Sequence, residues 1–148
     1  MLLEVLDEKL IQLNIEAENF EDALSKSALP LLAEGKITKA YIEAILESNR
    51  ENGPYFVLAK HVALPHASSK AGVLEKAIGI TTLKTPVISG QGANDPVKYL
   101  FCLSATDQTS HLEALASLAG LLANPEFFDV LDQAATPKEI MDYLQKVV

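Results

Sequence analysis

Cysteine and long apolar runs are scarce in this sequence, and each shortage excludes a class of protein. The single cysteine, Cys102, cannot form an internal disulfide, so a secreted fold held by disulfide bonds is excluded. No apolar run approaches the about 20 residues that a membrane-spanning helix needs. The first residues lack the basic segment and the small-residue cleavage site of a signal peptide. We therefore expect a cytoplasmic protein that does not insert into the membrane.

Basic residues are outnumbered by acidic ones. The chain has 12 lysine and arginine residues against 20 aspartate and glutamate residues, and its net charge is −8. Binding to nucleic acid or to an anionic membrane needs clustered lysine and arginine, so the sequence predicts no nucleic-acid partner. An acidic surface instead favours protein partners that present a basic face.

Several motifs of cofactor and metal chemistry are missing as well. The sequence contains no phosphate-binding P-loop, no G-x-G-x-x-G dinucleotide motif, no G-x-S-x-G nucleophile elbow and no H-E-x-x-H zinc motif. Nucleotide-dependent, dehydrogenase and hydrolase chemistry therefore has no support from motifs. We expect neither a cofactor nor a metal.

The sequence does contain the apolar patterns of an α/β domain. Its 148 residues, 49% of them hydrophobic, carry no repeat and no low-complexity linker, so we expect one domain over residues 1–148. Short apolar runs predict strands at 10–15, 55–58, 62–64, 77–83 and 97–103. The last run is almost continuously apolar, as in a strand buried on both faces, and Pro86 with a loop over 90–96 separates it from the run before.

Apolar residues at helical spacing flank these strands. Helices are expected from Phe20 to a stop near Gly35, from Thr38 to the turn at Gly53-Pro54, along Leu112, Leu115, Leu118 and Leu122, and after the caps Asn124 and Thr136. Elements in this order predict a three-layer α/β/α sandwich with a mixed central sheet flanked by helices.

His66 is the first candidate for chemistry, because it follows Leu64-Pro65 at the end of an apolar run. Proline fixes its own φ and biases the residue before it toward extended backbone, so His66 is expected to leave the strand at a fixed angle. The small residues Ala67 and Ser68 leave room for a reactant near the imidazole, whose neutral form has a nucleophilic nitrogen. On the residues alone, a structural histidine at a strand end is the commoner explanation.

His111 and Arg50 are the other candidates. His111 lies in the pattern Ser110-His111-Leu112-Glu113, which is typical of a capping box, and the first turn of a helix favours a bound anion. Arg50, just before the Gly53-Pro54 turn, has the guanidinium that binds a phosphate through two hydrogen bonds. For both residues a solvated surface role stays open.

A zinc site built from the three histidines is a further possibility. His61 and His66 are five positions apart, so a strand over 62–64 would place them on opposite faces of the sheet. We therefore give metal binding little weight and expect His61 to be an exposed bystander.

Two stretches of the chain together resemble a known family. GPYFVLAKHVALPHA at 53–67 and NDPVKYLFCLSATDQTSHLEALASLAGLL at 94–122 are similar to the enzyme IIA domain of the bacterial phosphoenolpyruvate-dependent sugar phosphotransferase system, mannitol/fructose type. With the flanking helices the resemblance covers nearly the whole chain. The sequences of the two stretches are most similar to those of the ascorbate-specific branch. The chain departs at Ala59-Lys60-His61, where many relatives have glycines.

The resemblance implies roles for the three candidates. His66 matches the histidine that accepts a phosphoryl group from phosphorylated HPr and passes it to enzyme IIB, which works with the membrane component IIC. His111 matches the second histidine, which orients the first one and its phosphoryl group. Arg50, in an Arg-Glu pair, matches an assisting arginine that the ascorbate-like branch need not keep.

Two functions follow from the resemblance. The first is a cytoplasmic phosphocarrier, here for the uptake of L-ascorbate. The second is a non-catalytic regulatory module of a transcription regulator controlled by the same system. The chain has no appendage for binding DNA or RNA, which favours the carrier.

Overall fold

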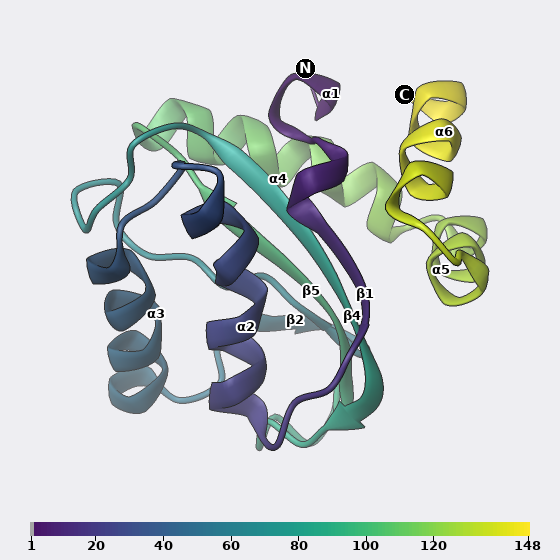
Figure 1. Ribbon diagram of the computed structural model, residues 1–148. Coiled ribbons are helices and arrows are strands. Elements are labelled where there is room, and N and C mark those ends of the chain that lie inside the picture. The colour runs from purple at the N-terminus through teal and green to yellow at the C-terminus, as the bar shows by residue number, and fades with distance from the viewer. Residues whose placement is uncertain (1) are drawn as a thin grey trace.

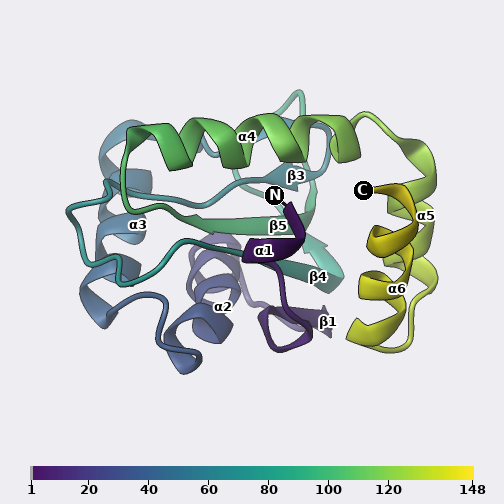
Figure 2. The same ribbon diagram turned by 90° about the horizontal axis from the view of Figure 1, so that it is seen from above.

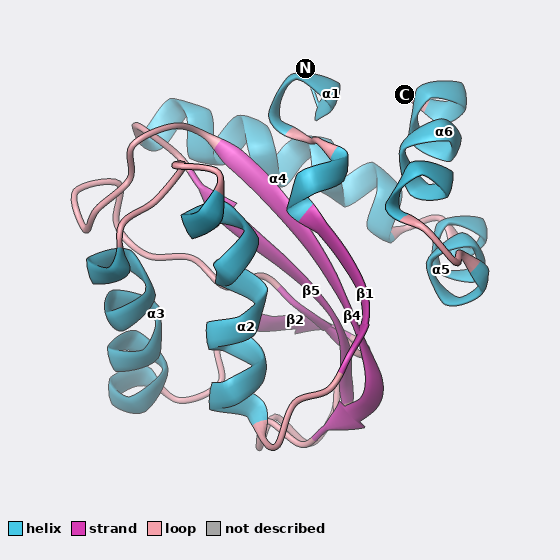
Figure 3. Cartoon of the chain, in the orientation of Figure 1, coloured by secondary structure: helices cyan, strands magenta, loops and turns pink. Residues whose placement is uncertain are grey.

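The computed structural model describes residues 2–148. Its strands are β1 (Ile11–Ile15), β2 (Val57–Ala59), β3 (Val62–Ala63), β4 (Ala77–Val87) and β5 (Val97–Ser104). Its helices are α1 (Leu2–Val5), α2 (Phe20–Ala33), α3 (Lys39–Asn52), α4 (Gln108–Leu122), α5 (Pro125–Gln133) and α6 (Pro137–Val147), with a short 3-10 helix over Glu8–Leu10. The predicted three-layer sandwich is confirmed, because α2 and α3 cover one face of the sheet while α4, α5 and α6 lie on the other (Figures 1 and 3).

The sheet is mixed, with the strand order β1-β4-β5-β3-β2. Strands β4 and β5 pair antiparallel, whereas β3 and β5 pair parallel, with Val62 beside Tyr99 and Ala63 beside Leu100. Parallel neighbours end at the same edge of a sheet. The segment that follows β3, which holds His66, therefore lies beside the end of β5, from which the chain enters α4 (Figure 2).

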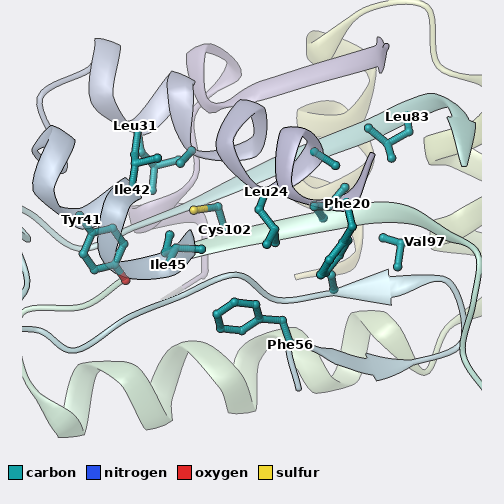
Figure 4. Close-up of a cluster of buried hydrophobic side chains, with 14 of the residues drawn as sticks. Phe20, Leu24, Leu31, Tyr41, Ile42, Ile45, Phe56, Leu83, Val97 and Cys102 are labelled. Carbon is teal, nitrogen blue, oxygen red and sulfur yellow. The ribbon is translucent and has the colours of Figure 1, made fainter. Parts of the chain in front are cut away.

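Apolar clusters lie on both faces of the sheet and form the core. On the side of α2 and α3, the cluster contains Phe20, Leu24, Tyr41, Ile45, Phe56 and Cys102 (Figure 4). On the side of α4 to α6, it contains Phe101, Leu118, Phe127 and Ile140. Neighbouring residues of β5 thus point to opposite clusters, as the predicted strand buried on both faces requires. Burial raises the pKa of the Cys102 thiol to about 12, so this side chain acts as a small apolar residue.

Strand β4 is longer than the sequence predicted, and Pro86 lies inside it. The reason is visible in the hydrogen-bond ladder. Regular pairing of β4 with β5 stops at Thr82 and resumes at Val87, and pairing with β1 ends at Leu83. Since a proline has no backbone N–H to donate, a strand tolerates it where the ladder is already interrupted.

Helix α4 begins earlier than predicted. The capping residue is Asp107, whose carboxylate accepts a hydrogen bond from the N–H of Ser110 at 2.7 Å, so the capping box expected at Ser110 is wrong. His111 still falls in the first turn, but Leu112 is 55% exposed while Leu118 and Leu121 are buried. The apolar face of α4 is therefore rotated away from Leu112.

The other predicted helix signals hold. Asn124 caps α5 through its side chain, and Glu139 reaches back to the N–H of Thr136 at the start of α6. Over residues 2–148, none of the helices has by itself the length and apolar character of a membrane span. Helices α4 and α5 have them only when taken together, and this pair is bent by 85°.

Candidate active site

His66 lies directly after β3, on a backbone segment that is held by hydrogen bonds to two neighbouring segments of the chain. The N–H of Leu64 donates to the carbonyl oxygen of Phe56 at 2.9 Å, and the N–H of Leu103 donates to that of Pro65 at 2.9 Å. The proline and the sheet together hold the chain at the point where the histidine side chain leaves it. As predicted, the backbone that carries His66 is therefore held in a fixed direction where it leaves the strand.

Tyr41 fastens the same segment from helix α3. Its hydroxyl donates to the carbonyl oxygen of Leu103 at 2.6 Å and accepts from the N–H of Ala67, the residue after His66, at 3.0 Å. The ring is 1% exposed and lies in the core cluster of Figure 4. Burial raises the pKa of this hydroxyl, so it stays protonated and can keep donating. Tyr41 thus connects α3, the end of β5 and the His66 segment.

One contact sets the tautomer of His66. Its Nδ1 lies 2.7 Å from the carbonyl oxygen of Leu64. A carbonyl oxygen only accepts hydrogen bonds, so Nδ1 carries the hydrogen and Nε2 keeps its lone pair. The ring of Phe56 meets the imidazole at an angle of 65°, with ring centroids 5.3 Å apart. The half-buried ring is therefore held in one orientation with Nε2 as its nucleophilic atom.

His111 lies beside His66. The two ring centroids are 4.9 Å apart and the rings are inclined by 43°. Burial lowers the pKa of His111, and the neighbouring His66 lowers it further, so His111 is neutral at pH 7. A neutral imidazole has one N–H donor to offer to an anionic group on His66. The structure thus brings together the two histidines that the sequence placed 45 positions apart.

The two histidines open into a pocket of about 480 Å³. The small residues Ala67 and Ser68 line it next to His66, as the sequence led us to expect, and Ser48 and Tyr55, whose side chains carry hydroxyl groups, line it as well. The hydroxyls of Ser48 and Tyr55 lie 2.8 Å apart. The pocket therefore offers a nucleophile, a neutral imidazole and hydroxyl donors around one open space.

Asp107 lines the pocket as well, and it changes the electrostatics expected at the start of α4. Its hydrogen bond from the N–H of Ser110 lowers the pKa of the carboxyl, which stays ionised. The carboxylate therefore takes part of the helix N-terminus that the sequence assigned to an anion.

Arg50 is not among the residues that line the pocket. Its guanidinium lies 2.8 Å and 3.2 Å from one carboxylate oxygen of Glu21, and this pair raises the pKa of Arg50. Ala44 and Ser48 of α3 face the pocket, and a residue two positions after Ser48 lies about 200° further around a helix. The phosphate contact expected for Arg50 stays a prediction that this arrangement does not favour.

His61 is half-buried, so the predicted exposure is wrong. It lies in the turn between β2 and β3 with φ of 68°, and its Nδ1 is 2.7 Å from the carbonyl oxygen of Pro96. Its N–H donates to the carbonyl oxygen of Asn94 at 2.8 Å. This turn packs His61 against the 94–96 loop, and His61 does not line the pocket. Within residues 2–148, no three His, Cys, Asp or Glu side chains form a group able to hold a metal.

Tyr41, Ser48, Tyr55 and Asp107 were not identified from the sequence as parts of the site. The spacing of Tyr41, Ala44 and Ser48 was a usable signal, because residues three and four apart share one face of a helix. Asp107 is a favoured N-cap residue three positions before Ser110, which was also visible in the sequence. The pairing of Ser48 with Tyr55 depends on the turn between them and could not be read in advance.

The fold and the site define an α/β domain with two neighbouring histidines at the carboxyl ends of parallel strands. Residues 4–147 match the family model described as "Phosphoenolpyruvate-dependent sugar phosphotransferase system, EIIA 2". The chain belongs to this family, as the resemblance predicted.

Individual relatives agree with this membership. The chain is 34% identical, over 98% of both chains, to the mannitol-specific cryptic phosphotransferase enzyme IIA component of Escherichia coli K12. It is 33% identical to the ascorbate-specific PTS system EIIA component of Shigella flexneri, over 95% of this chain and 92% of the relative. The solution structure of the mannitol-specific cryptic enzyme IIA CmtB from Escherichia coli superposes with a TM-score of 0.83, at 35% identity over 95% of both chains.

Proposed function

We propose that this protein is a cytoplasmic phosphocarrier that accepts a phosphoryl group from phosphorylated HPr on His66 and passes it to an enzyme IIB. The observation that carries the proposal is the contact of His66 Nδ1 with the carbonyl oxygen of Leu64, which leaves Nε2 free beside His111 in the pocket. Membership of the enzyme IIA family supports the same role.

The transfer consists of two displacements at phosphorus. In the first, the lone pair of His66 Nε2 attacks the phosphorus of the donor's phosphohistidine; the N–P bond of the donor breaks and its nitrogen recovers the electron pair. In the second, a thiolate or imidazole of enzyme IIB attacks in turn, and the bond from Nε2 to phosphorus breaks. The hydrogen on Nδ1 stays in place throughout, held by the carbonyl oxygen of Leu64. No nucleotide takes part.

The protein contributes positioning and charge stabilisation to these steps. Pro65 and Tyr41 fix the segment that carries His66, so its Nε2 meets the incoming phosphorus without rearrangement. Neutral His111 donates its N–H to a phosphoryl oxygen as negative charge gathers there. The net charge of −8 favours encounter with a carrier that presents a basic face.

We propose L-ascorbate as the sugar whose uptake this carrier serves, because its sequence motifs resemble those of the ascorbate-specific branch and one of its relatives is an ascorbate-specific component. The sugar itself never meets enzyme IIA, so specificity for the pathway lies in the choice of enzyme IIB. An assay with one ascorbate-type and one mannitol-type enzyme IIB tests this choice. Faster discharge onto the ascorbate-type protein is expected, and preference for the mannitol-type protein would contradict it.

The function as a whole is tested by reconstituting the relay. The protein is incubated with labelled phosphoenolpyruvate, enzyme I and HPr, and the phosphorylated protein is then mixed with enzyme IIB. We expect an acid-labile label that depends on HPr and moves onto enzyme IIB within seconds to minutes. A label that forms but discharges onto no enzyme IIB would favour a regulatory module, and the absence of any label would refute both functions.

A further inference from the structure

The hydroxyl pair in the pocket has no role in the two-histidine scheme. Ser48 lies in the last turns of α3, and Tyr55 follows the turn that Gly53 makes with φ of 75° at the end of that helix. This turn brings the Tyr55 hydroxyl to 2.8 Å from the Ser48 Oγ, and the side-chain amide of Asn52 donates to the same Oγ at 3.4 Å. The three groups form a short hydrogen-bonded chain, and two of its members, Ser48 and Tyr55, line the pocket.

A count of hydrogens shows what this chain can offer. The pair has two hydroxyl hydrogens, and the bond between Ser48 and Tyr55 uses one of them. For the other, the hydrogen bonds within residues 2–148 include no acceptor, whichever hydroxyl carries it. Because Asn52 already donates to Ser48, donation from Ser48 to Tyr55 completes the chain in one direction. In that direction the free hydrogen belongs to Tyr55; in the opposite direction Ser48 accepts from both Asn52 and Tyr55 and keeps its own hydrogen free.

The ring of Tyr55 is held next to the reacting imidazole. It meets the ring of His66 at 81° with centroids 6.0 Å apart, and it packs on Phe56 with centroids 4.3 Å apart. Phe56 is fully buried and also contacts His66, so the two aromatic rings and the imidazole form one packed group. Tyr55 and His66 both line the pocket, so a phosphoryl group on Nε2 of His66 would lie in the space that Tyr55 borders.

The charge balance of the pocket calls for such a donor. A phosphoryl group carries about −1.5 to −2 charges at neutral pH and three acceptor oxygens. Arg50 is paired with Glu21 and does not line the pocket, while the Asp107 carboxylate does. His111 supplies one N–H. Neutral donors in the pocket lining can offset the repulsion from Asp107 without adding charge; they are Ser48, Tyr55, Ser68, Ser69 and Gln108. Among these, Tyr55 packs its ring against the imidazole of His66.

We propose that Tyr55, oriented by Ser48, is a phosphoryl-binding residue that donates its hydroxyl hydrogen to the phosphoryl group on His66 in the place left open by Arg50. The proton stays on the tyrosine oxygen during transfer. This inference rests on the proposed function, since it needs a phosphoryl group on His66.

Tyr55→Phe and Ser48→Ala test the inference, with Tyr143→Phe as a matched control. The control removes a hydroxyl that accepts a hydrogen bond from Asn124, away from the pocket. Transfer from phosphorylated HPr is measured for kcat and KM. We expect Tyr55→Phe to lower kcat about tenfold or more, the loss typical of one hydrogen bond to a charged group. KM should change little because the ring remains, and Ser48→Ala should show a smaller loss.

A phosphorus NMR titration separates direct contact from a structural effect. Removing a donor disfavours the phosphoryl dianion, so the pKa of the phosphoryl group should rise in Tyr55→Phe and stay unchanged in Tyr143→Phe. If Tyr55→Phe matches the control in both kcat and phosphoryl pKa, the inference is wrong while the phosphocarrier stands. If His66→Ala accepts the label as well as the unmodified protein does, the proposed function itself is wrong.

Discussion

The Nδ1 nitrogen of His66 lies 2.7 Å from the carbonyl oxygen of Leu64, two residues earlier in the chain. This contact leaves only Nε2 with a lone pair, so the phosphoryl group should form its bond there. Proton–nitrogen NMR of the phosphorylated, ¹⁵N-histidine-labelled protein distinguishes the two isomers. We expect Nε2-phosphohistidine at position 66. A phosphoryl group on Nδ1 would require the contact with Leu64 to break and would contradict the proposed geometry.

His111 should titrate below the usual histidine pKa of about 6.5, because it is partly buried and lies next to His66. An NMR titration of the ring protons checks this directly. In His66→Ala the pKa of His111 should rise only part of the way, since burial is the larger cause and stays in place. A value at or above the usual one in the unmodified protein would refute the neutral state assigned to His111.

The same shift has a consequence for stability. The unfolded chain binds a proton at position 111 at higher pH than the folded chain does, so stability should fall as the pH drops from about 6.5 through the lower folded-state pKa. His111→Gln removes this contribution, so the free energy of unfolding of the variant, measured with urea, should fall less over that pH range. Equal losses in both proteins would show that His111 is not the responsible group.

Tyr41→Phe should destabilise the protein by about 1–3 kcal/mol, because it leaves the carbonyl oxygen of Leu103 and the N–H of Ala67 without their partner. Transfer to His66 should also slow, since the segment that carries it loses one of its attachments. Urea unfolding and the transfer assay measure the two effects, and Tyr143→Phe again serves as the control. Unchanged stability would mean that the hydroxyl contributes no net hydrogen bonding.

Arg50→Ala should transfer phosphate at about the rate of the unmodified protein. The guanidinium is paired with Glu21 on the side of α3 that faces away from the pocket, so it does not reach a phosphoryl group on His66. The pair is exposed to solvent, where an ion pair contributes little to stability, so its loss should leave the fold intact. Glu21→Ala removes the ion-pair partner of Arg50 and therefore shows whether an unpaired arginine changes the transfer rate. A loss of a hundredfold or more in Arg50→Ala would show that the arginine leaves Glu21 and enters the pocket during transfer.

Much of the fold could be predicted from the sequence, because its signals were local and strong. The run over 97–103 had the composition of a strand buried on both faces, and the caps Asn124 and Thr136 had the expected side chains. The start of α4 was misplaced because Ser110 with Glu113 imitates a capping box while Asp107, an equally favoured N-cap residue, stands three residues before it. Two overlapping cap signals cannot be ranked without the helix contacts.

The site was predictable only in part. Pro65 before His66 gave a physical reason to expect a presented imidazole, the helix-start pattern around Ser110 drew attention to His111, and the family resemblance joined the two histidines into one site. The hydroxyl of Tyr41, by contrast, joins residues 26 and 62 positions away, and no spacing rule anticipates such bonds. Arg50 looked well placed from its position near the Gly53 turn, but it lies about 200° around α3 from the pocket-lining Ser48. Its guanidinium pairs with Glu21 of α2, a contact between two helices that the sequence does not show.

The most direct test of the central claim is labelling by phosphorylated HPr of the unmodified protein, His66→Ala and His61→Ala side by side. The two variants remove the two histidines of one short stretch, so each controls for the other. We expect full acid-labile labelling of the unmodified protein and of His61→Ala, and none of His66→Ala once circular dichroism has shown that it is folded. Normal labelling of a folded His66→Ala, or its loss in a folded His61→Ala, would contradict the assignment of His66 as the phosphoryl acceptor.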